Sequence, residues 1–394
     1  MYSVYIDYFS HISLSKRVGQ VFNGGDNGTK LLLLQIMESQ YYLTRKNYLI
    51  LHKGYVPADK YEEKIIDGKF FEKIYVNALD EVDYKENAVL FVPLVCGREM
   101  IMVDSLKKKF PKLKIYGRIH DKNHNFPFDI YDRYYYSGIG RTGLTVFLDY
   151  FGKKLLFGLK YSSWIKNFDK IFTVSNYSLQ KLKDRNVKVI NYYYQGILDC
   201  YSTPKEKLDR VYKNEYILLV NGGRPEKNSF RTIEAFCKYK KMHPEDKIML
   251  YVTSIKKDVQ NCLLKKLEHE PTYSGEFVKM FEYLPYGELQ RMYSECAFLL
   301  FTSKGEGFGM PVLEAAMCGR PVLASWNTSI PEVLGSSIRY VNPFSVDSIA
   351  EGISYYRDKD NIKIYEEAIK RRLKIVQEQI KEDARMFMRE LYEE

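Results

Sequence analysis

The sequence predicts an α/β protein made of two doubly wound, Rossmann-like domains that face each other across a cleft. Its 394 residues suit two domains of ordinary size. Short apolar runs, typical of buried strands, alternate throughout with segments of helical periodicity, which is the pattern of parallel βαβ layers. A polar stretch without sustained apolar periodicity, residues 201–215, separates two sets of such runs and is interpreted as the linker.

Strand-like runs divide between the two domains. The first domain, residues 1–200, has them at 2–8, 48–53, 73–78, 88–92, 114–120, 170–174 and 187–192. The second domain, residues 216–375, has them at 216–220, 247–252, 277–283, 297–301, 321–324 and 338–341. Helical periodicity is clear at 30–43, 229–242, 258–268 and 361–391. Ligands of such sheets bind at the carboxyl ends of the strands, so a site is expected in the loops that follow the strands.

The composition excludes a disordered chain and shows no membrane span. Hydrophobic residues make up 45% of the chain, and 35 Tyr with 22 Phe are far more aromatics than a solvating chain carries. No apolar run reaches the roughly 18–20 residues that cross a bilayer, and the N-terminus resembles a first strand rather than a signal peptide. Six scattered cysteines without a Cys-x-x-Cys pair predict reduced thiols in a cytoplasmic protein, with no disulfide framework and no structural zinc.

The net charge of +10 is concentrated in the N-terminal half. Residues 1–200 hold 30 Lys and Arg against 21 Asp and Glu, whereas the remaining residues hold 30 against 29. A basic half suggests an anionic partner such as a membrane surface or a phosphorylated substrate, and a merely basic solvated surface is the alternative. Residues 149–170 interleave lysines with aromatics and leucines, which suits a helix on an anionic membrane or an ordinary packed amphipathic helix. No nucleic-acid module is recognisable, so nucleic acid is not expected.

The sharpest motif is the stretch 298–325, FLLFTSKGEGFGMPVLEAAMCGRPVLAS. A buried strand leads into a glycine-rich loop at 305–309, and Pro311 follows near the start of a helix, whose N-terminus favours a phosphate. Glu306 lies in the loop and Glu314 about one turn into the helix, so both carboxylates are placed to accept hydrogen bonds from a hydroxyl-rich ligand. Taken singly, each has a plainer interpretation, as a helix-dipole carboxylate or a solvated helix position.

A pair of cations follows another buried strand. Arg224 and Lys227 come directly after the strand-like run 216–220 and the glycine pair 222–223, so they emerge at the carboxyl edge of the same sheet. Two cations at that edge can neutralise a leaving diphosphate. Two surface cations in a loop are the alternative.

These motifs resemble the donor site of the GT-B glycosyltransferases of family 4, the "glycosyl transferases group 1" domain, in which a Glu, seven residues and a second Glu flank a Phe-Gly segment. The resemblance covers most of residues 216–342. It implies a retaining hexosyltransferase. Such an enzyme moves a sugar from a nucleotide-diphosphate donor, UDP first and GDP second, to a saccharide or lipid-linked saccharide in cell-surface polysaccharide or glycoconjugate synthesis. The Asp-x-Asp at 358–360 is expected to be a solvated turn, so no metal and no cofactor beyond the nucleotide sugar are expected.

The resemblance also implies roles residue by residue. Arg224 and Lys227 would hold the diphosphate, Glu314 the ribose hydroxyls and Glu306 the hydroxyls of the transferred sugar. His120, at a strand end, would lie beside the reacting sugar, although by itself it is equally a loop histidine. The catalytic set is therefore His120, Glu306, Arg224 and Lys227. The donor-binding set is Gly24, Gly25, Gly223, Arg224, Lys227, Leu284, Pro285, Glu306, Gly307, Phe308, Gly309, Met310 and Glu314.

The first domain would then bind the acceptor and the second the donor. Tyr131, Tyr134 and Tyr135 are candidate acceptor-site residues, because tyrosine rings stack on sugar faces and their hydroxyls form hydrogen bonds. Packing in the core is their alternative role. The final segment, residues 376–394, is expected to be a helix that crosses back to the first domain, as in the family.

Two other functions stay open at this stage. A sugar-nucleotide epimerase of the same architecture would bind the same donors and need no acceptor. A non-catalytic carbohydrate-binding scaffold would keep the fold without the chemistry. In each case a cytoplasmic location is expected, with a peripheral contact to the inner face of the plasma membrane as an open alternative.

Overall fold

The chain folds into two compact units in a computed structural model. Unit 1 comprises Met1–Asn123, Lys154–Leu198 and Glu378–Glu394, and unit 2 comprises His124–Lys153 and Asp199–Gln377. The structure describes residues 3–8, 26–39, 45–53, 55, 57, 60–67, 69–95, 97–119, 131–132, 144–145, 148, 151–152, 155, 164–183, 216–268, 275–284 and 286–393. Tyr131 and Asp132 belong to unit 2 in this division, and they form hydrogen bonds with Glu234 and Lys304 of that unit.

Unit 1 contains a parallel six-stranded sheet in the order β3-β2-β1-β4-β5-β6. Its strands are β1 (Ser3–Asp7), β2 (Lys46–His52), β3 (Glu72–Val76), β4 (Ala88–Val92), β5 (Lys114–Ile119) and β6 (Lys170–Thr173). The first strand lies in the middle, with Tyr5 opposite Tyr48 of β2 and Leu90 of β4. The chain therefore winds outward from β1 in both directions, which is the doubly wound topology.

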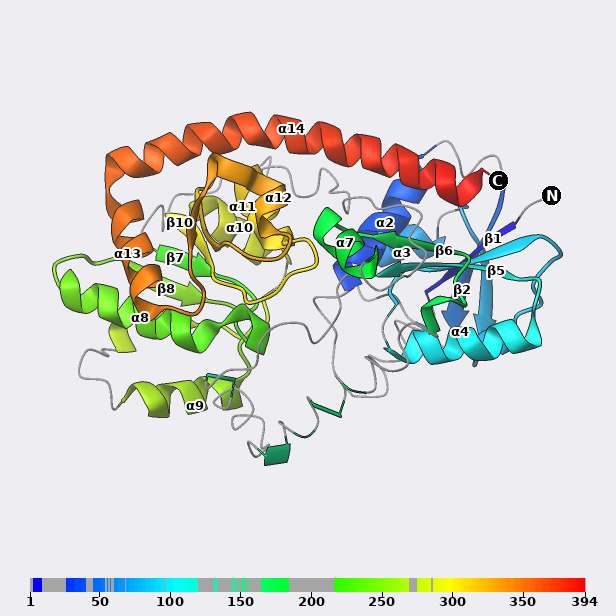
Figure 1. Ribbon diagram of the computed structural model, residues 1–394, viewed down its shortest axis with the longest axis horizontal. Helices are drawn as coiled ribbons and strands as arrows, with labels where there is room; N and C mark the ends of the chain where they lie inside the picture. The colour runs from blue at the N-terminus through cyan, green and yellow to red at the C-terminus, as the bar shows by residue number, and fades with distance from the viewer. Residues whose placement is uncertain are drawn as a thin grey trace. The chain divides into compact units, whose positions relative to one another are not determined.

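Helices cover both faces of this sheet (Figure 1). Val4 and Ile6 pack in the same core as α2, α3 and the end of the last helix, whereas Tyr5 packs with α4 in a second core. Because both faces are buried, the strands are nearly continuous apolar runs. The helices of unit 1 whose bounds the structure describes include α2 (Asp26–Glu38), α3 (Lys60–Asp67), α4 (Gly97–Lys109) and α7 (Asn176–Lys183), with the 3-10 helix η2 (Leu79–Glu81).

Unit 2 repeats the same strand order. Its parallel sheet runs β9-β8-β7-β10-β11-β12, so β7 and β10 flank its switch point. Helices α8, α9 and α13 share one core with the sheet, and α10 to α12 lie on its other side (Figure 1). The strands are β7 (Tyr216–Leu219), β8 (Met249–Val252), β9 (Val278–Met280), β10 (Phe298–Phe301), β11 (Val322–Ser325) and β12 (Arg339–Val341). The helices of unit 2 whose bounds the structure describes include η4 (Pro225–Lys227), α8 (Ser229–Met242), α9 (Lys257–Leu267), η5 (Gly275–Phe277), α10 (Tyr286–Glu295), α11 (Met310–Met317), α12 (Ile330–Leu334), η6 (Gly335–Ser337) and α13 (Val346–Arg357).

The predicted fold class is confirmed. Every strand-like run within the described residues is a strand, to within a few residues at its ends. The run at 187–192 and the linker at 201–215 lie outside the described residues. Helix α8 has the predicted bounds, whereas α2 begins at Asp26, four residues before the predicted start. Its first turn, Asp-Asn-Gly-Thr, is polar, so hydrophobic periodicity does not mark it.

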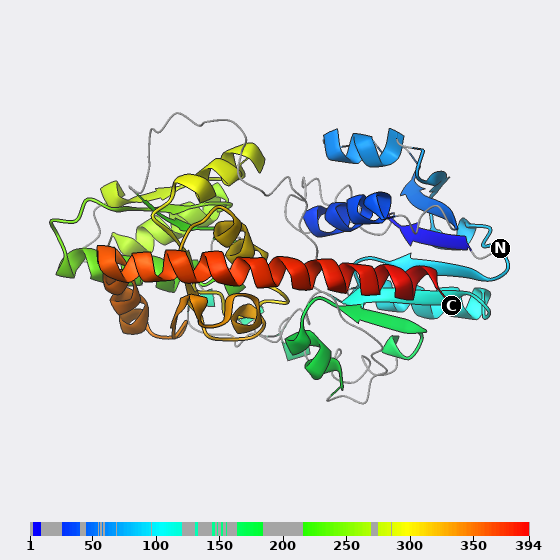
Figure 2. The same cartoon turned by 90° about the horizontal axis from the view of Figure 1, so that it is seen from above.

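The last helix, α14 (Lys359–Tyr392), begins in unit 2 and ends in unit 1 (Figures 1 and 2). In unit 2, Arg372 donates to the backbone carbonyl of Glu332 at 2.9 Å. In unit 1, the Tyr392 hydroxyl donates to Asn47 Oδ1 at 2.8 Å. The helix is long but strongly charged, and across the described part of the chain no helix is both long and apolar enough to span a membrane.

Candidate functional site

Two loops at the switch point of the unit 2 sheet carry most of the predicted donor-binding residues. One follows β7 and passes through η4 into α8, and the other follows β10 into α11. The two strands are adjacent and parallel, with Ile217 opposite Phe298, so both loops leave the same edge of the sheet. Ligands of doubly wound sheets bind at this place, where neighbouring connections diverge to opposite faces.

A buried ion pair joins the two loops. Lys227 Nζ lies 2.5 Å from Glu306 Oε1, and the side chains are 4% and 12% exposed. The same ammonium lies 5.0 Å from the centroid of the Phe301 ring. Such a pair stabilises both charges, since either one alone would be desolvated and uncompensated. The residues predicted to hold a diphosphate and a sugar hydroxyl are therefore direct neighbours.

The main chain of Glu306 is held by the loop that follows β11. Its N–H donates to Thr328 Oγ1 at 3.0 Å, and its carbonyl accepts from Ser329 Oγ at 3.0 Å. Asn327 Nδ2 donates to the carbonyl of Lys304, also at 3.0 Å. These contacts fix the backbone on which the Glu306 carboxylate stands, so a ligand would meet a preorganised group.

Glu314 joins this group from helix α11. Burial raises the pKa of Glu314 to about 7, and the Tyr293 hydroxyl and the Lys227 ammonium lower it. The helix begins after Gly309, whose φ of 98° lies in the left-handed region, and its first turn has neither a side-chain cap nor an acidic residue. An uncapped helix N-terminus leaves N–H groups that favour an anion. Lys227, Glu306 and Glu314 thus form one cluster beside that terminus.

Arg224 stands apart from the cluster. Its side chain is 60% exposed and pairs with Glu226, whose carbonyl accepts the backbone N–H of Lys304 at 2.7 Å. Gly223 lies so close to the carbonyl of Ser254 that a Cβ would collide with it, which explains glycine there. Arg224 is therefore accessible to a ligand as it stands, whereas Lys227 becomes accessible when its pairing with Glu306 changes.

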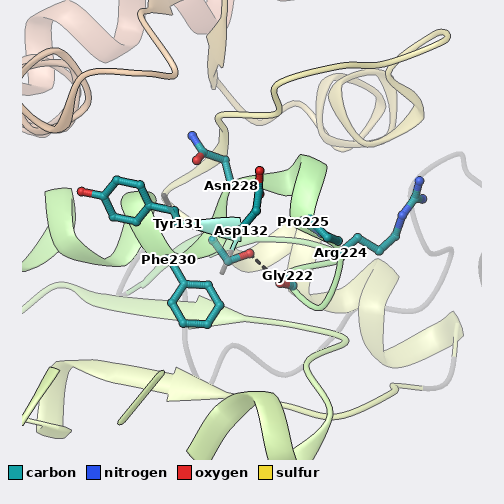
Figure 3. Close-up of a pocket in the computed structure, with 8 residues that line it drawn as sticks. Tyr131, Asp132, Gly222, Arg224, Pro225, Asn228 and Phe230 are labelled. Atoms are coloured by element: carbon teal, nitrogen blue, oxygen red, sulfur yellow. Dashed lines mark hydrogen bonds between the residues drawn. The ribbon is translucent and has the colours of Figure 1, made fainter. Parts of the chain in front are cut away.

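A small pocket with a cavity volume of about 10 Å³ opens beside the loop after β7 (Figure 3). The Ser229 hydroxyl closes the loop by donating to the carbonyl of Gly222 at 2.7 Å, and Arg224 extends away from the other side chains. The pocket is lined by Tyr131, Asp132, Gly222, Arg224, Pro225, Asn228, Ser229 and Phe230. Ligand sites typically measure about 300–1,000 Å³, so this pocket by itself does not enclose a nucleotide sugar.

The remaining predicted site residues differ in burial, and several lie outside the described residues. Leu284, Gly307 and Met310 are half-buried, whereas Phe308 is only 4% exposed and therefore offers a ligand little of its side chain. The hydroxyl of Tyr131 donates to a glutamate of unit 2. Gly24, Gly25, His120, Tyr134, Tyr135 and Pro285 lie outside the described residues, and their roles stay predictions.

Sequence reasoning missed two polar residues that hold the loops. Asn228 has a φ of 63°, and its side-chain amide donates to the carbonyls of Thr302 and Pro343 at 3.2 and 2.6 Å. Asparagine tolerates the left-handed region, so a turn at the start of α8 was readable in principle. Lys304 pairs with Asp132, 172 residues away, and no local pattern indicates that contact.

Two doubly wound parallel units, with charged loops gathered at the switch point of the second, define a two-domain protein of the Rossmann-like class. The family model described as "Glycosyl transferases group 1" matches residues 202–374, which include both loops. Residues 202–374, which are less than half of the chain, are therefore similar to the glycosyl transferases group 1 family.

Individual relatives agree with this assignment. The chain is similar to O-antigen chain mannosyltransferase B of Escherichia coli, 29% identical over 199 residues, which are 46% of this chain and 50% of the relative. It is 27% identical to O-antigen chain mannosyltransferase RfbU of Salmonella typhimurium over 201 residues, which are 50% of this chain and 53% of the relative. The chain matches about half the length of each. A solved glycosyltransferase from Rickettsia africae ESF-5 has a TM-score of 0.64 over 100% of this chain and 99% of its own, at 15% identity, which confirms the GT-B fold.

Proposed function

We propose that this chain is a retaining glycosyltransferase that moves a hexose from a nucleotide-diphosphate donor to a saccharide or lipid-linked saccharide acceptor in cell-surface polysaccharide synthesis. The cluster of Lys227, Glu306 and Glu314 at the switch point carries the proposal. The names of the two bacterial relatives favour mannose as the sugar and an O-antigen-type chain as the product. UDP and then GDP are the donor nucleotides that we would test first.

The cations and the helix would hold the donor diphosphate. Lys227 would exchange part of its contact with Glu306 for a phosphate oxygen, and the exposed Arg224 would turn toward the same group. The N-terminus of α11, which has no side-chain cap, would add the positive end of its helix dipole. As the bond between the anomeric carbon and the phosphate oxygen breaks, negative charge grows on the diphosphate, where these groups stabilise it most.

The carboxylates would hold the hydroxyls of the donor. Glu306 would accept hydrogen bonds from the transferred sugar and Glu314 from the ribose. In front-face attack, the acceptor oxygen bonds to the anomeric carbon on the side from which the diphosphate departs, and the departing phosphate oxygen takes the acceptor's proton. The step needs no protein nucleophile, and His120 would lie beside the reacting sugar.

A panel of nucleotides tests the donor site. We expect one of UDP, GDP, ADP, dTDP and CMP to stabilise the wild-type chain against heat and to stabilise Glu314→Gln much less, because the ribose loses an ionised acceptor. A ligand at 100 times its Kd adds about 2.7 kcal/mol. Glu351→Gln, the same change at an exposed position of α13, should respond like wild type. If no nucleotide raises the melting temperature, the donor site is wrong and the scaffold function takes its place.

Product analysis separates transfer from epimerisation. The wild-type chain is incubated with sugar derivatives of the stabilising nucleotide and without an acceptor. Under these conditions a transferase at most hydrolyses the nucleotide sugar slowly. An epimerised nucleotide sugar in that reaction would instead establish the epimerase.

Metal independence is a further part of the proposal. Among the described residues, no three His, Cys, Asp or Glu side chains gather as metal ligands would. Asp358, in the Asp-x-Asp segment, accepts the N–H groups of Asp360 and Asn361 at 2.8 and 3.1 Å, so it caps the start of α14. We expect transfer to be unchanged by excess EDTA. An EDTA-sensitive rate that Mn²⁺ restores would contradict this.

An exposed apolar stripe supports a peripheral membrane contact in this proposal. Leu144, Leu148, Phe151 and Leu155 are helical, three or four residues apart, and 53–70% exposed. Apolar residues at that spacing in the sequence are typical of one face of an amphipathic helix. The sequence at 153–154 adds two lysines, which suit anionic lipid headgroups.

Vesicle sedimentation tests this contact. At low salt we expect the full chain to sediment with vesicles rich in phosphatidylglycerol, and Leu148→Ser/Phe151→Ser to stay largely in the supernatant. Ile375→Ser, at a 60% exposed position of α14, is the matched control and should bind like wild type. Failure of the wild-type chain to bind anionic vesicles would remove the membrane from the proposal.

A further inference from the structure

The stretch of chain between β5 and β6 sends two residues to the donor loops of unit 2. Strands β5 and β6 belong to unit 1, yet Tyr131 and Asp132 group with unit 2. Both residues line the pocket beside the loop after β7, on the side opposite the Arg224 side chain (Figure 3). The sequence predicted an acceptor role for Tyr131 and none for Asp132.

Asp132 forms a fully buried ion pair with Lys304. The Lys304 ammonium lies 2.6 Å from Asp132 Oδ1, and the two side chains are 0% and 2% exposed. Lys304 lies two residues before Glu306 in the same loop. Its backbone N–H donates a hydrogen bond to the carbonyl of Glu226, and its carbonyl accepts one from the Asn327 side chain. The residue that Asp132 neutralises is therefore at the base of the loop that carries Glu306.

Tyr131 acts on the other loop through Arg231. The Arg231 guanidinium lies over the Tyr131 ring, 4.3 Å from its centroid, and the Tyr131 hydroxyl donates to Glu234 Oε2 at 2.9 Å. Arg231 in turn donates to Asn228 Oδ1 at 2.8 Å. Asn228 directly follows Lys227, so Tyr131 supports the turn that presents the Lys227 ammonium.

We propose that Tyr131 and Asp132 are positioning residues. They fix the two donor loops relative to each other, so that Lys227 and Glu306 contact a nucleotide sugar in the correct geometry. Tyr131 reaches Lys227 through Arg231 and Asn228, and Asp132 reaches Glu306 through Lys304. The inference rests on the proposed function. It adds that a segment outside the family's match at residues 202–374 is part of the donor site.

The chemistry of the contact supports positioning rather than simple packing. Leaving one charge of a buried ion pair without its partner is strongly destabilising, so the pair resists displacement of either side chain. Displacement of a catalytic group by about 1 Å can cost on the order of 100-fold in rate. A fixed ionic contact two residues from Glu306 is suited to prevent such a displacement.

The test compares three variants of the full chain. Asp132→Asn removes the charge and keeps the shape, and Asp132→Asn/Lys304→Met removes both charges, so that no buried charge is left unpaired if the single variant fails to fold. Asp347→Asn makes the same change at a 68% exposed aspartate that pairs with Lys238, and it serves as the matched control. For each we would measure the melting temperature without ligand, the shift caused by the stabilising nucleotide, and kcat/KM for the donor well below the melting temperature.

We expect Asp132→Asn and the double variant to lose at least tenfold in kcat/KM for the donor and most of the nucleotide-induced shift, with Asp347→Asn unchanged. If the folded variants melt earlier but keep the wild-type kcat/KM and nucleotide shift, Asp132 is merely structural and the inference is overturned while the donor site stands. If no nucleotide stabilises the wild-type chain, the proposed function fails, and the inference fails with it.

Discussion

Replacing Lys227 by Met is expected to lower kcat by about 10²–10³-fold, the usual cost of removing one group that stabilises charge in a transition state. The ammonium is the buried cation of the switch-point cluster, and the exposed Arg224 cannot take its place without leaving Glu226. The variant also leaves Glu306 buried without its partner, which typically costs about 3–5 kcal/mol of folding free energy. Transfer rates under saturating donor and urea unfolding of the same preparation measure the two effects.

The double variant Lys227→Met/Glu306→Gln separates these effects. It removes both charges, so most of the lost folding stability should return, whereas the transfer rate should stay low because neither group is left to hold the donor. Lys238→Met, at an exposed ion pair of α8, should change stability by less than about 1 kcal/mol and leave the rate unchanged. A Lys227→Met enzyme within a few-fold of the wild-type kcat would remove the cation from the mechanism.

Glu314 is expected to make both stability and donor binding depend on pH near neutrality. Burial raises the pKa of Glu314 from 4.5 to about 7 in the folded chain. A raised carboxyl pKa means that the folded state favours the protonated form, so the stability contributed by this group is full below about pH 4.5 and is lost as the pH rises through 7. The loss amounts to about 3 kcal/mol. Urea unfolding at a series of pH values, compared with Glu314→Gln, measures it.

Donor affinity should change in the opposite direction. In the proposed site the ionised Glu314 carboxylate would accept hydrogen bonds from the ribose hydroxyls, so nucleotide affinity should rise by up to about tenfold between pH 6 and pH 8. In Glu314→Gln both the affinity and the unfolding free energy should lose this pH dependence, while Glu351→Gln keeps it. If nucleotide affinity and unfolding free energy change with pH in the same way in wild type and in Glu314→Gln, Glu314 titrates outside the measured pH range.

The fold was readable from the sequence because both sheets are parallel and covered on both faces. Their strands must then be short, nearly continuous apolar runs separated by helices, and this pattern is local. The motif around Glu306 and Glu314 was readable for a similar reason. A strand, a glycine-rich loop and a helix with an early proline follow one another in 20 residues, so the sequence alone places a phosphate-compatible loop at a strand end.

What the sequence determined by itself was therefore the class of each element, the two-unit α/β fold and the identity of the charged residues at the switch point. The pairing of those charges depends on the folded arrangement of the loops: Lys227 pairs with Glu306, Lys304 pairs with Asp132, and Glu314 lies half-buried beside Lys227. These two kinds of information act over different distances along the chain. Backbone propensity and hydrophobic periodicity act over a few neighbours, whereas an ion pair between residues 79 or 172 positions apart exists only after strand order has brought their loops together.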